Sequence, residues 1–143
     1  MLFSEGIAES VDDPSIPPTA RLWRRVFSSL RYWDQQKCKY RPASGAFRDH
    51  NLLYPGLSVY VVGETTVEAA LKDGPGMELV EFPVAIARQK NCRVVRDDRD
   101  EVGHALIFGS GTGGRLTKSQ AEHLAEESTY VVPDPSTMPS PTS

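Results

Sequence analysis

Residues 79–108 read LVEFPVAIARQKNCRVVRDDRDEVGHALIF, and they hold three strand-like runs with no predicted helix between them. The runs are Leu79–Ala87, Cys92–Arg96 and His104–Phe108, which contain many of the β-branched and aromatic residues that favour strands. Pro83 has no N–H to donate to a neighbouring strand, so we expect a bulge or a sheet edge there. Successive strands without intervening helices are typical of an α+β fold rather than an alternating α/β fold.

The flanking segments add two predicted strands and two predicted helices. Leu57–Val62 is a strand by composition, and Glu64–Lys72 follows it as a short helix with one apolar face. A second helix is predicted over Thr117–Glu127, whose first residue and Gln120 have the spacing of a capping box. Tyr130–Val132 is the last predicted strand. The sequence therefore predicts a small mixed or antiparallel sheet of about five short strands with two or three helices.

The segment before residue 34 is compatible with two structures. Large apolar residues recur there at the spacing of a helix face, and Thr19 is a suitable N-cap, so a helix is the favoured interpretation. The same residue types also favour sheets, and the alternative is a short strand over Leu22–Phe27. The residues of the apolar stripe are Trp23, Val26, Phe27, Leu30 and Trp33.

Length and composition predict one domain with a tail at each end. The chain has 143 residues, of which 39% are hydrophobic and 24% are charged, and this composition suits a single domain with a buried core. Residues 1–19 contain several prolines and are predicted to form an extended arm. Residues 133–143 are almost entirely Pro, Ser and Thr and are predicted to be disordered. The α+β domain is expected over residues 20–132.

The sequence favours the cytoplasm and predicts no metal site. No run approaches the roughly 20 apolar residues that span a bilayer, and the first ten residues do not resemble a secretory signal. Cys38 and Cys92 are too few and too far apart for a disulfide scaffold or a cysteine-rich zinc site. His50, His104 and His123 show none of the HxxxH, HxH or HExxH spacings of metal ligands. We expect His104 to hydrogen-bond a backbone carbonyl at the start of its strand.

Positive charge is concentrated between residues 21 and 48. Eight Arg and Lys residues in this segment face one acid, Asp34, so its balance is 8 − 1 = +7, whereas the whole chain has a net charge of −3. Aromatic residues are interspersed among the cations, which is the composition of a surface that binds phosphates and stacks bases. The alternative is that the aromatic residues are core and the cations are its solvated face. The candidate anion-binding residues are Arg24, Arg25, Arg31, Lys39 and Arg41.

A glycine-rich loop, Gly109–Gly114, has the spacing GxGxxG between a predicted strand and a predicted helix. Glycines in this context allow backbone N–H groups to approach a phosphate, so Gly109, Gly111 and Gly114 are a candidate phosphate loop. In a dinucleotide-binding domain further βα units would follow, but the chain ends about thirty residues later. The favoured interpretation is therefore a hairpin or lid loop without a ligand.

Three short motifs occur in an order that resembles a family of small bacterial proteins without an established activity. They are RPASGAF at residues 41–47, LSVY at residues 57–60 and GHALIFG at residues 103–109. The resemblance covers about residues 22–133 and implies no ligand.

A second similarity is to the ADP-ribosyltransferase-like folds, including the RES-type toxin domains. This resemblance implies NAD as the cofactor, with Arg41 contacting the pyrophosphate. It further implies that Ser58 and Tyr60 line the nicotinamide pocket and that Glu64 or Glu68 polarises the ribose. The chain departs from the family pattern because it has no catalytic glutamate at the expected place near the C-terminal strands.

Three functions follow from these patterns. The leading hypothesis is a non-catalytic interaction domain, an accessory component of a bacterial multi-protein system with a protein partner, no membrane association and no cofactor. Its basis is the scarcity of catalytic motifs together with two tails suited to docking on a partner. The alternatives are an NAD-using ADP-ribosyltransferase-like enzyme and a protein that binds nucleic acid or nucleotides through residues 21–48.

Overall fold

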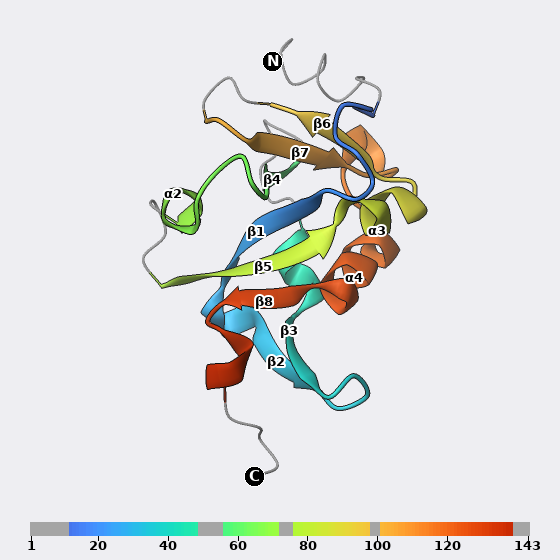
Figure 1. Ribbon diagram of the computed structural model, residues 1–143. Coiled ribbons are helices and arrows are strands. Elements are labelled where there is room, and N and C mark those ends of the chain that lie inside the picture. Colours follow the sequence, from blue (N-terminus) through green and yellow to red (C-terminus); the bar gives the residue numbers. More distant parts are fainter. Residues whose placement is uncertain (1–11, 49–55, 72–75, 98–100, 139–143) are drawn as a thin grey trace.

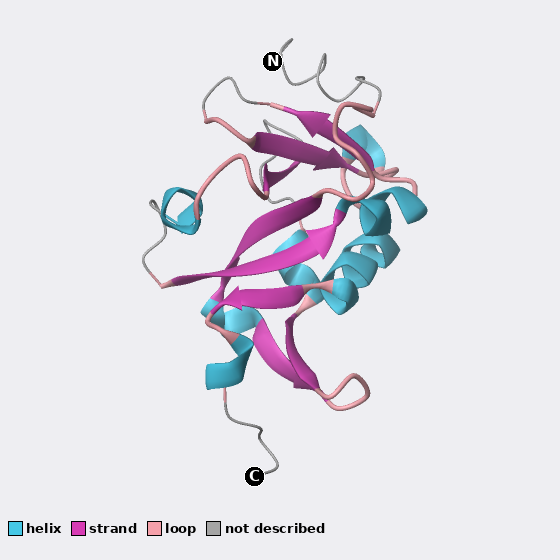
Figure 2. Cartoon of the chain, in the orientation of Figure 1, coloured by secondary structure: helices cyan, strands magenta, loops and turns pink. Residues whose placement is uncertain are grey.

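The computed structural model describes residues 12–48, 56–71, 76–97 and 101–138. They form a six-stranded sheet and a separate two-stranded hairpin, with helices packed on the sheet (Figures 1 and 2). The sheet strands are β1 (Arg21–Phe27), β4 (Leu57–Val61), β5 (Met77–Pro83), β6 (Arg93–Arg96), β7 (His104–Phe108) and β8 (Thr129–Val132). The hairpin strands are β2 (Arg31–Asp34) and β3 (Lys39–Pro42). The helices are α2 (Val67–Leu71), α3 (Val84–Gln89) and α4 (Lys118–Glu127).

The predicted α+β fold is confirmed. The strand order in the sheet is β6-β7-β4-β1-β5-β8, and every pair of neighbours is antiparallel. The described residues also contain four short 3-10 turns: η1 (Ser28–Leu30), η2 (Ser44–Phe47), η3 (Thr112–Gly114) and η4 (Pro135–Thr137). The first strand of the described residues thus lies in the interior of the sheet, between β4 and β5.

The two faces of the sheet are covered unequally. Helices α3 and α4 and the turn η2 pack on one face, where the main core contains Leu22, Phe47 and Leu124. On the opposite face a smaller cluster around Trp23 and Tyr60 packs against the short helix α2. Consecutive strand residues point to opposite faces, which is why neighbouring residues of β1 belong to different clusters. We call these the α4 face and the α2 face.

The favoured helix over the first apolar stripe is wrong, and the alternative strand is confirmed. In β1, Leu22 and Val26 face the main core, Trp23 faces the α2 cluster, and the side chain of Phe27 is 63% exposed. The spacing matched a helix by coincidence, because both faces of the sheet are covered at β1 and the strand has apolar residues on each. Trp33 belongs to the hairpin strand β2, which the sequence did not predict.

The strand predicted over Leu79–Ala87 ends early. Pro83 is the last residue of β5 and the N-cap of α3, and its φ of −71° suits the start of a helix. β5 is an interior strand, and the irregularity in its pairing lies between Leu79 and Val80 rather than at the proline. The other predicted elements after residue 56 are present, and α4 has the expected capping box between Thr117 and Gln120.

The ends of the described chain are packed against the domain. Ile16, within the predicted arm of residues 1–19, is fully buried in the main core. Asp12 accepts a hydrogen bond from the Val94 amide at 2.8 Å, and the Asp13 amide donates to the Val94 carbonyl at 2.9 Å. Residues 133–138 of the predicted tail include η4, and the Met138 sulfur accepts a hydrogen bond from Arg31. Within the described residues, no helix is long and apolar enough to cross a membrane.

Candidate functional sites

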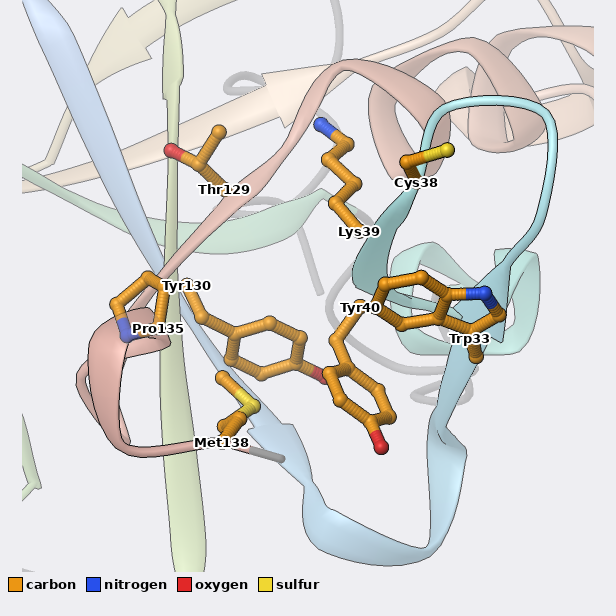
Figure 3. Close-up of a pocket in the computed structure, with 8 residues that line it drawn as sticks. All are labelled: Trp33, Cys38, Lys39, Tyr40, Thr129, Tyr130, Pro135 and Met138. Atoms are coloured by element: carbon orange, nitrogen blue, oxygen red, sulfur yellow. The ribbon is translucent and has the colours of Figure 1, made fainter. Parts of the chain in front are cut away.

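A cavity of about 370 Å³ lies between the β2–β3 hairpin and the C-terminal end of the domain (Figure 3). Its volume is within the range of small-ligand pockets, and apolar side chains supply most of its wall. We call it the hairpin pocket. It is lined by Trp33, Cys38, Lys39, Tyr40, Thr129, Tyr130, Pro135 and Met138.

The pairing of the two hairpin strands places two aromatic side chains together in the wall of the pocket. Trp33 and Tyr40 are directly opposite each other in the two strands, and their rings pack edge to face at 5.1 Å. Asp34 holds the turn, since its carboxylate accepts hydrogen bonds from the amides of Gln36 and Lys37 and from Arg41 at 2.6 Å. The Arg41 side chain and the Lys37 amide hold the pKa of Asp34 below its usual value. The wall of the pocket is therefore a constrained structure.

Two lysines attach the hairpin to the end of α4 and the start of β8. The Lys37 ammonium pairs with Glu127 at 3.1 Å, and the Lys39 ammonium donates to the Ser128 carbonyl at 2.9 Å. Burial, and next the positive charge of Lys37, lower the pKa of Lys39. The Lys39 ammonium, which lines the pocket, is therefore already hydrogen-bonded to the protein.

Tyr130, which lines the hairpin pocket, and the neighbouring Glu78 carry buried polar groups. Glu78 and Tyr130 are only 8% and 5% exposed, and neither Oε1 of Glu78 nor the Tyr130 hydroxyl has a hydrogen-bond partner among the described residues. Figure 3 shows the Tyr130 ring opposite the hairpin, with its oxygen directed toward Tyr40. The other oxygen of Glu78 is 3.5 Å from Arg31 Nη1, which in turn donates to Met138 Sδ at 3.3 Å. A buried polar group without a partner costs about 1–3 kcal/mol, so it points to a ligand or a functional constraint.

Burial sets the protonation of this pair. It raises the pKa of Tyr130, as does the neighbouring Glu78 carboxylate, so the hydroxyl remains a donor at neutral pH. Burial also raises the pKa of Glu78, and the attraction of Arg31 offsets only part of that effect. Of the two groups, only Tyr130 lines the pocket, where its hydroxyl can serve as a hydrogen-bond donor.

A second group of polar residues lies on the α2 face, across β4 and β7. Ser58 Oγ is 2.6 Å from His104 Nε2, and His104 Nδ1 is 2.9 Å from the main-chain oxygen of Asp97. Tyr60 donates to Glu101 at 2.9 Å, and its ring packs edge to face on His104 at 5.4 Å. The expected bond between His104 and a backbone carbonyl is present. We call these five residues the β4–β7 cluster.

The residues predicted for NAD binding are only partly brought together. Ser58 and Tyr60 point to the same face of β4 and belong to the β4–β7 cluster. Glu64 follows β4, pairs with Arg96 and lies against Gly103. Arg41 lies on the hairpin, where it pairs with Asp34 and its guanidinium is 4.7 Å from the centre of the Tyr32 ring. Glu68, the other acid considered, is an exposed residue of α2.

The predicted anion-binding residues do not form one surface. Arg24 donates to the carbonyls of Ala46 and Ser58 at 3.0 and 2.9 Å, and so links β1 to η2 and to β4. Arg31, Lys39 and Arg41 bond Glu78, Ser128 and Asp34 respectively. The guanidinium of Arg25 lies 5.8 Å from the Tyr60 ring on the α2 face. Four of these five cations therefore direct donors at protein oxygens.

The amides of the candidate phosphate loop are used within the protein. The amides of Gly109 and Gly111 donate to Gly114 and Arg115 carbonyls at 2.8 Å, and the Ser110 amide donates to Gln120 Oε1 at 3.2 Å. A Cβ added at Gly109 would lie 2.4 Å from Gln120 Oε1, so close packing accounts for that glycine. The loop serves to join β7 to α4.

Of the other two histidines, only His123 lies in the part of the chain that the structure describes. His123 Nε2 is buried without a hydrogen-bond partner among the described residues, and His50 lies outside them. In the part of the chain that the structure describes, no three His, Cys, Asp or Glu residues are grouped as metal ligands.

No protein-family model, curated protein or solved structure matches this chain.

Proposed function

We propose that the protein is an interaction domain, an accessory component of a bacterial multi-protein system, that receives an aromatic side chain of a protein partner in the hairpin pocket. The observation that carries this proposal is the combination of an apolar cavity with the unpartnered hydroxyl of Tyr130, which lines it. The partner supplies a ring for the apolar wall and a carbonyl or hydroxyl oxygen for the Tyr130 donor.

The residue types of the pocket support a protein partner. Tyr, Trp and Met are enriched at the centres of protein interfaces, where a few anchors supply most of the binding energy. Trp33, Tyr40, Tyr130 and Met138 are of these types, and they come from the hairpin, from β8 and from the segment after η4. The ionic contacts of Asp34 and Lys37 hold the hairpin in place before binding, which lowers the entropic cost of association.

The test is a comparison of captured partners from the native host. Wild-type protein and the Trp33→Ala variant are immobilised, and bound proteins are identified by mass spectrometry. The matched control is Phe27→Ala, which removes an exposed ring away from the pocket. We expect one or more proteins to be retained by the wild type and by Phe27→Ala and lost with Trp33→Ala. Equal retention by all three proteins, or no specific retention by the wild type, contradicts the proposal.

A direct binding test uses N-acetyl-phenylalaninamide as a minimal side-chain probe. It should shift the backbone NMR signals of Trp33, Tyr40 and Tyr130 in the millimolar range, since so small a probe gains little contact area. Tyr130→Phe should weaken this binding about fivefold, the effect of one hydrogen bond of about 1 kcal/mol. Shifts confined to residues outside the pocket count against the assignment.

The two alternative functions have weaker geometric support. NAD binding is favoured by the adjacency of Ser58 and Tyr60, but Arg41 is paired with Asp34 on the hairpin. Nucleic-acid binding requires several cations on one surface, whereas Arg24 and Arg31 are engaged inside the protein. Calorimetry with NAD and gel shifts at about 50 mM salt, where phosphate contacts are strong, test these alternatives separately.

A further inference from the structure

Ser58, His104 and Asp97 form a continuous chain of hydrogen bonds on the α2 face. Ser58 Oγ is 2.6 Å from His104 Nε2, and His104 Nδ1 is 2.9 Å from the Asp97 carbonyl and 3.5 Å from its carboxylate Oδ2. The three residues come from β4, from the start of β7 and from the segment after β6. This is the order hydroxyl, imidazole, orienting oxygen that activates serine nucleophiles.

The partners of His104 determine its tautomer. A carbonyl oxygen can only accept a hydrogen bond, so Nδ1 of the neutral ring must carry the proton that it shares with Asp97. Nε2 then has a lone pair directed at Ser58, and the serine hydroxyl donates to it. The imidazole is therefore in the tautomer that accepts a proton from Ser58 when the oxygen attacks an electrophile.

Ser58 is partly exposed and has aliphatic neighbours on one side. Ser58 and His104 are partly exposed, and the His104 side chain is 14% exposed. In the sheet register Ser58 is opposite Leu106, and Leu106 is opposite Val95, so the three half-buried side chains form a row across β4, β7 and β6. Leu106 and Val95 therefore place an aliphatic surface beside the Ser58 hydroxyl.

The cluster lies on the opposite sheet face from the hairpin pocket. Tyr130 belongs to the main core on the α4 face, whereas Tyr60, beside Ser58, belongs to the cluster on the α2 face. An activity at Ser58 is thus independent of the interaction function proposed above. It would also revise the expectation of a protein without catalysis.

We propose that Ser58 is a nucleophile for acyl transfer from esters with a short aliphatic acyl group. Ser58 Oγ forms a bond to the ester carbonyl carbon as its proton moves to His104 Nε2. The tetrahedral intermediate collapses, the carbon–alkoxide bond breaks, and the alcohol leaves with the proton from His104. Water then repeats the sequence on the acylated serine, which releases the carboxylic acid and restores Ser58 and neutral His104. The Asp97 carbonyl orients the ring, and its carboxylate stabilises the imidazolium.

The test is covalent labelling of the full chain with an alkyl fluorophosphonate. Ser58 Oγ displaces fluoride from phosphorus, its proton passes to His104, and the stable adduct is located by peptide mass spectrometry. We expect labelling at Ser58 in the wild type and none in Ser58→Ala, while Ser29→Ala, a change at an exposed serine, labels as the wild type does. His104→Asn should slow labelling by about 100-fold or more, because general-base assistance is worth that much.

Two further measurements accompany the labelling: a folding control and an ester-hydrolysis assay. Circular dichroism shows whether each variant is folded. If Ser58→Ala is unfolded, the proposal is tested by the labelling rate of His104→Asn and by the site of labelling in the wild type. Hydrolysis of p-nitrophenyl butyrate should show a burst of nitrophenol equal to the protein concentration in the wild type. The proposal is overturned if Ser58 of the folded wild type is unlabelled, or if the folded His104→Asn variant labels at the wild-type rate.

Discussion

Tyr130 carries a buried hydroxyl that the free protein does not use, and this predicts an unusual response to its removal. Tyr130→Phe keeps the ring in the main core but deletes an oxygen without a partner among the described residues. We expect the free energy of unfolding to rise by about 1 kcal/mol, because a buried unpaired polar group is costly. Urea denaturation measures it.

The matched control for this change is Tyr60→Phe. Its hydroxyl donates to Glu101 at 2.9 Å, so its loss should lower the free energy of unfolding by about 0.5–1.5 kcal/mol. If Tyr130→Phe were the more destabilising of the two, the Tyr130 hydroxyl would have a partner in solution, and the basis of the pocket assignment would be lost.

Glu78 predicts a stability that changes with pH in a defined direction. Its pKa is raised from the usual 4.5 by burial, so the folded state binds the proton more tightly than the unfolded state. The contribution of Glu78 to stability is therefore present below pH 4.5 and is lost as the pH rises through the raised value. Relative to wild type, Glu78→Gln should gain stability between about pH 4 and pH 7, measured by urea denaturation at each pH.

Glu127→Gln is the control with the opposite sign. The Lys37 side chain lowers the pKa of Glu127, so this carboxylate stabilises the fold above its unfolded pKa and ceases to do so in acid. Glu127→Gln should therefore lose stability relative to wild type over the same rise in pH. If the difference in free energy of unfolding from wild type changed with pH in the same direction for both variants, burial would not raise the pKa of Glu78.

At the scale of elements, the connection between β7 and α4 depends on a close approach at Gly109. A Cβ there would lie 2.5 Å from the Arg115 carbonyl and from Leu116 Cα, which are backbone atoms and cannot turn away. Gly109→Ala should lower the free energy of unfolding by about 1–3 kcal/mol, the usual cost of overpacking. Thermal unfolding with Gly45→Ala as the control tests this.

Gly45 is a suitable control because its added Cβ would meet only a Leu30 methyl group at 4.0 Å. Gly45→Ala should change the free energy of unfolding by less than about 0.5 kcal/mol. Equal effects of the two alanines would show that the loop at residues 109–114 can move away from Gln120, and that its glycines have another purpose.

Elements fixed by local signals were predictable from the sequence, and those fixed by distant partners were not. α4 was predicted because Thr117 and Gln120 lie within one turn, and its capping box is visible as a spacing. β1 was misassigned because a strand covered on both faces has apolar residues on each, and its partner strands begin only at Leu57 and Met77.

The same limit applies to the candidate sites. Ser58 and His104 are 46 residues apart, and their approach depends on the register of β4 and β7. The hairpin pocket combines residues from 33 to 138, and its free donor depends on which polar atoms remain unpaired after folding. Ser58 and Tyr60 were named only through the resemblance to ADP-ribosyltransferase-like folds and for a different role, whereas Glu78 and Tyr130 have no local signal.

For the whole molecule, the N-terminal segment from residue 12 is part of the fold, and Ile16 tests this. Its side chain is fully buried in the main core, so Ile16→Ala should lower the free energy of unfolding by about 2–5 kcal/mol. Ile16→Val, which removes one methylene group, should cost about 0.5–1.5 kcal/mol. Denaturant midpoints of both variants measure the effect. An Ile16→Ala protein as stable as wild type would mean that residues 12–19 form a detachable arm.

The interior position of β1 has a consequence for how the chain is made. The ribosome releases β1 first, yet the strands on its two sides end only at Val61 and Pro83. At about 5–20 residues per second, roughly 3–11 s separate the emergence of Phe27 from that of Pro83. During that interval both apolar faces of β1 and its unpaired amides are exposed on the nascent chain. The sheet must then assemble after most of the chain has left the ribosome, through contacts between distant segments, which is the slow regime of milliseconds to seconds.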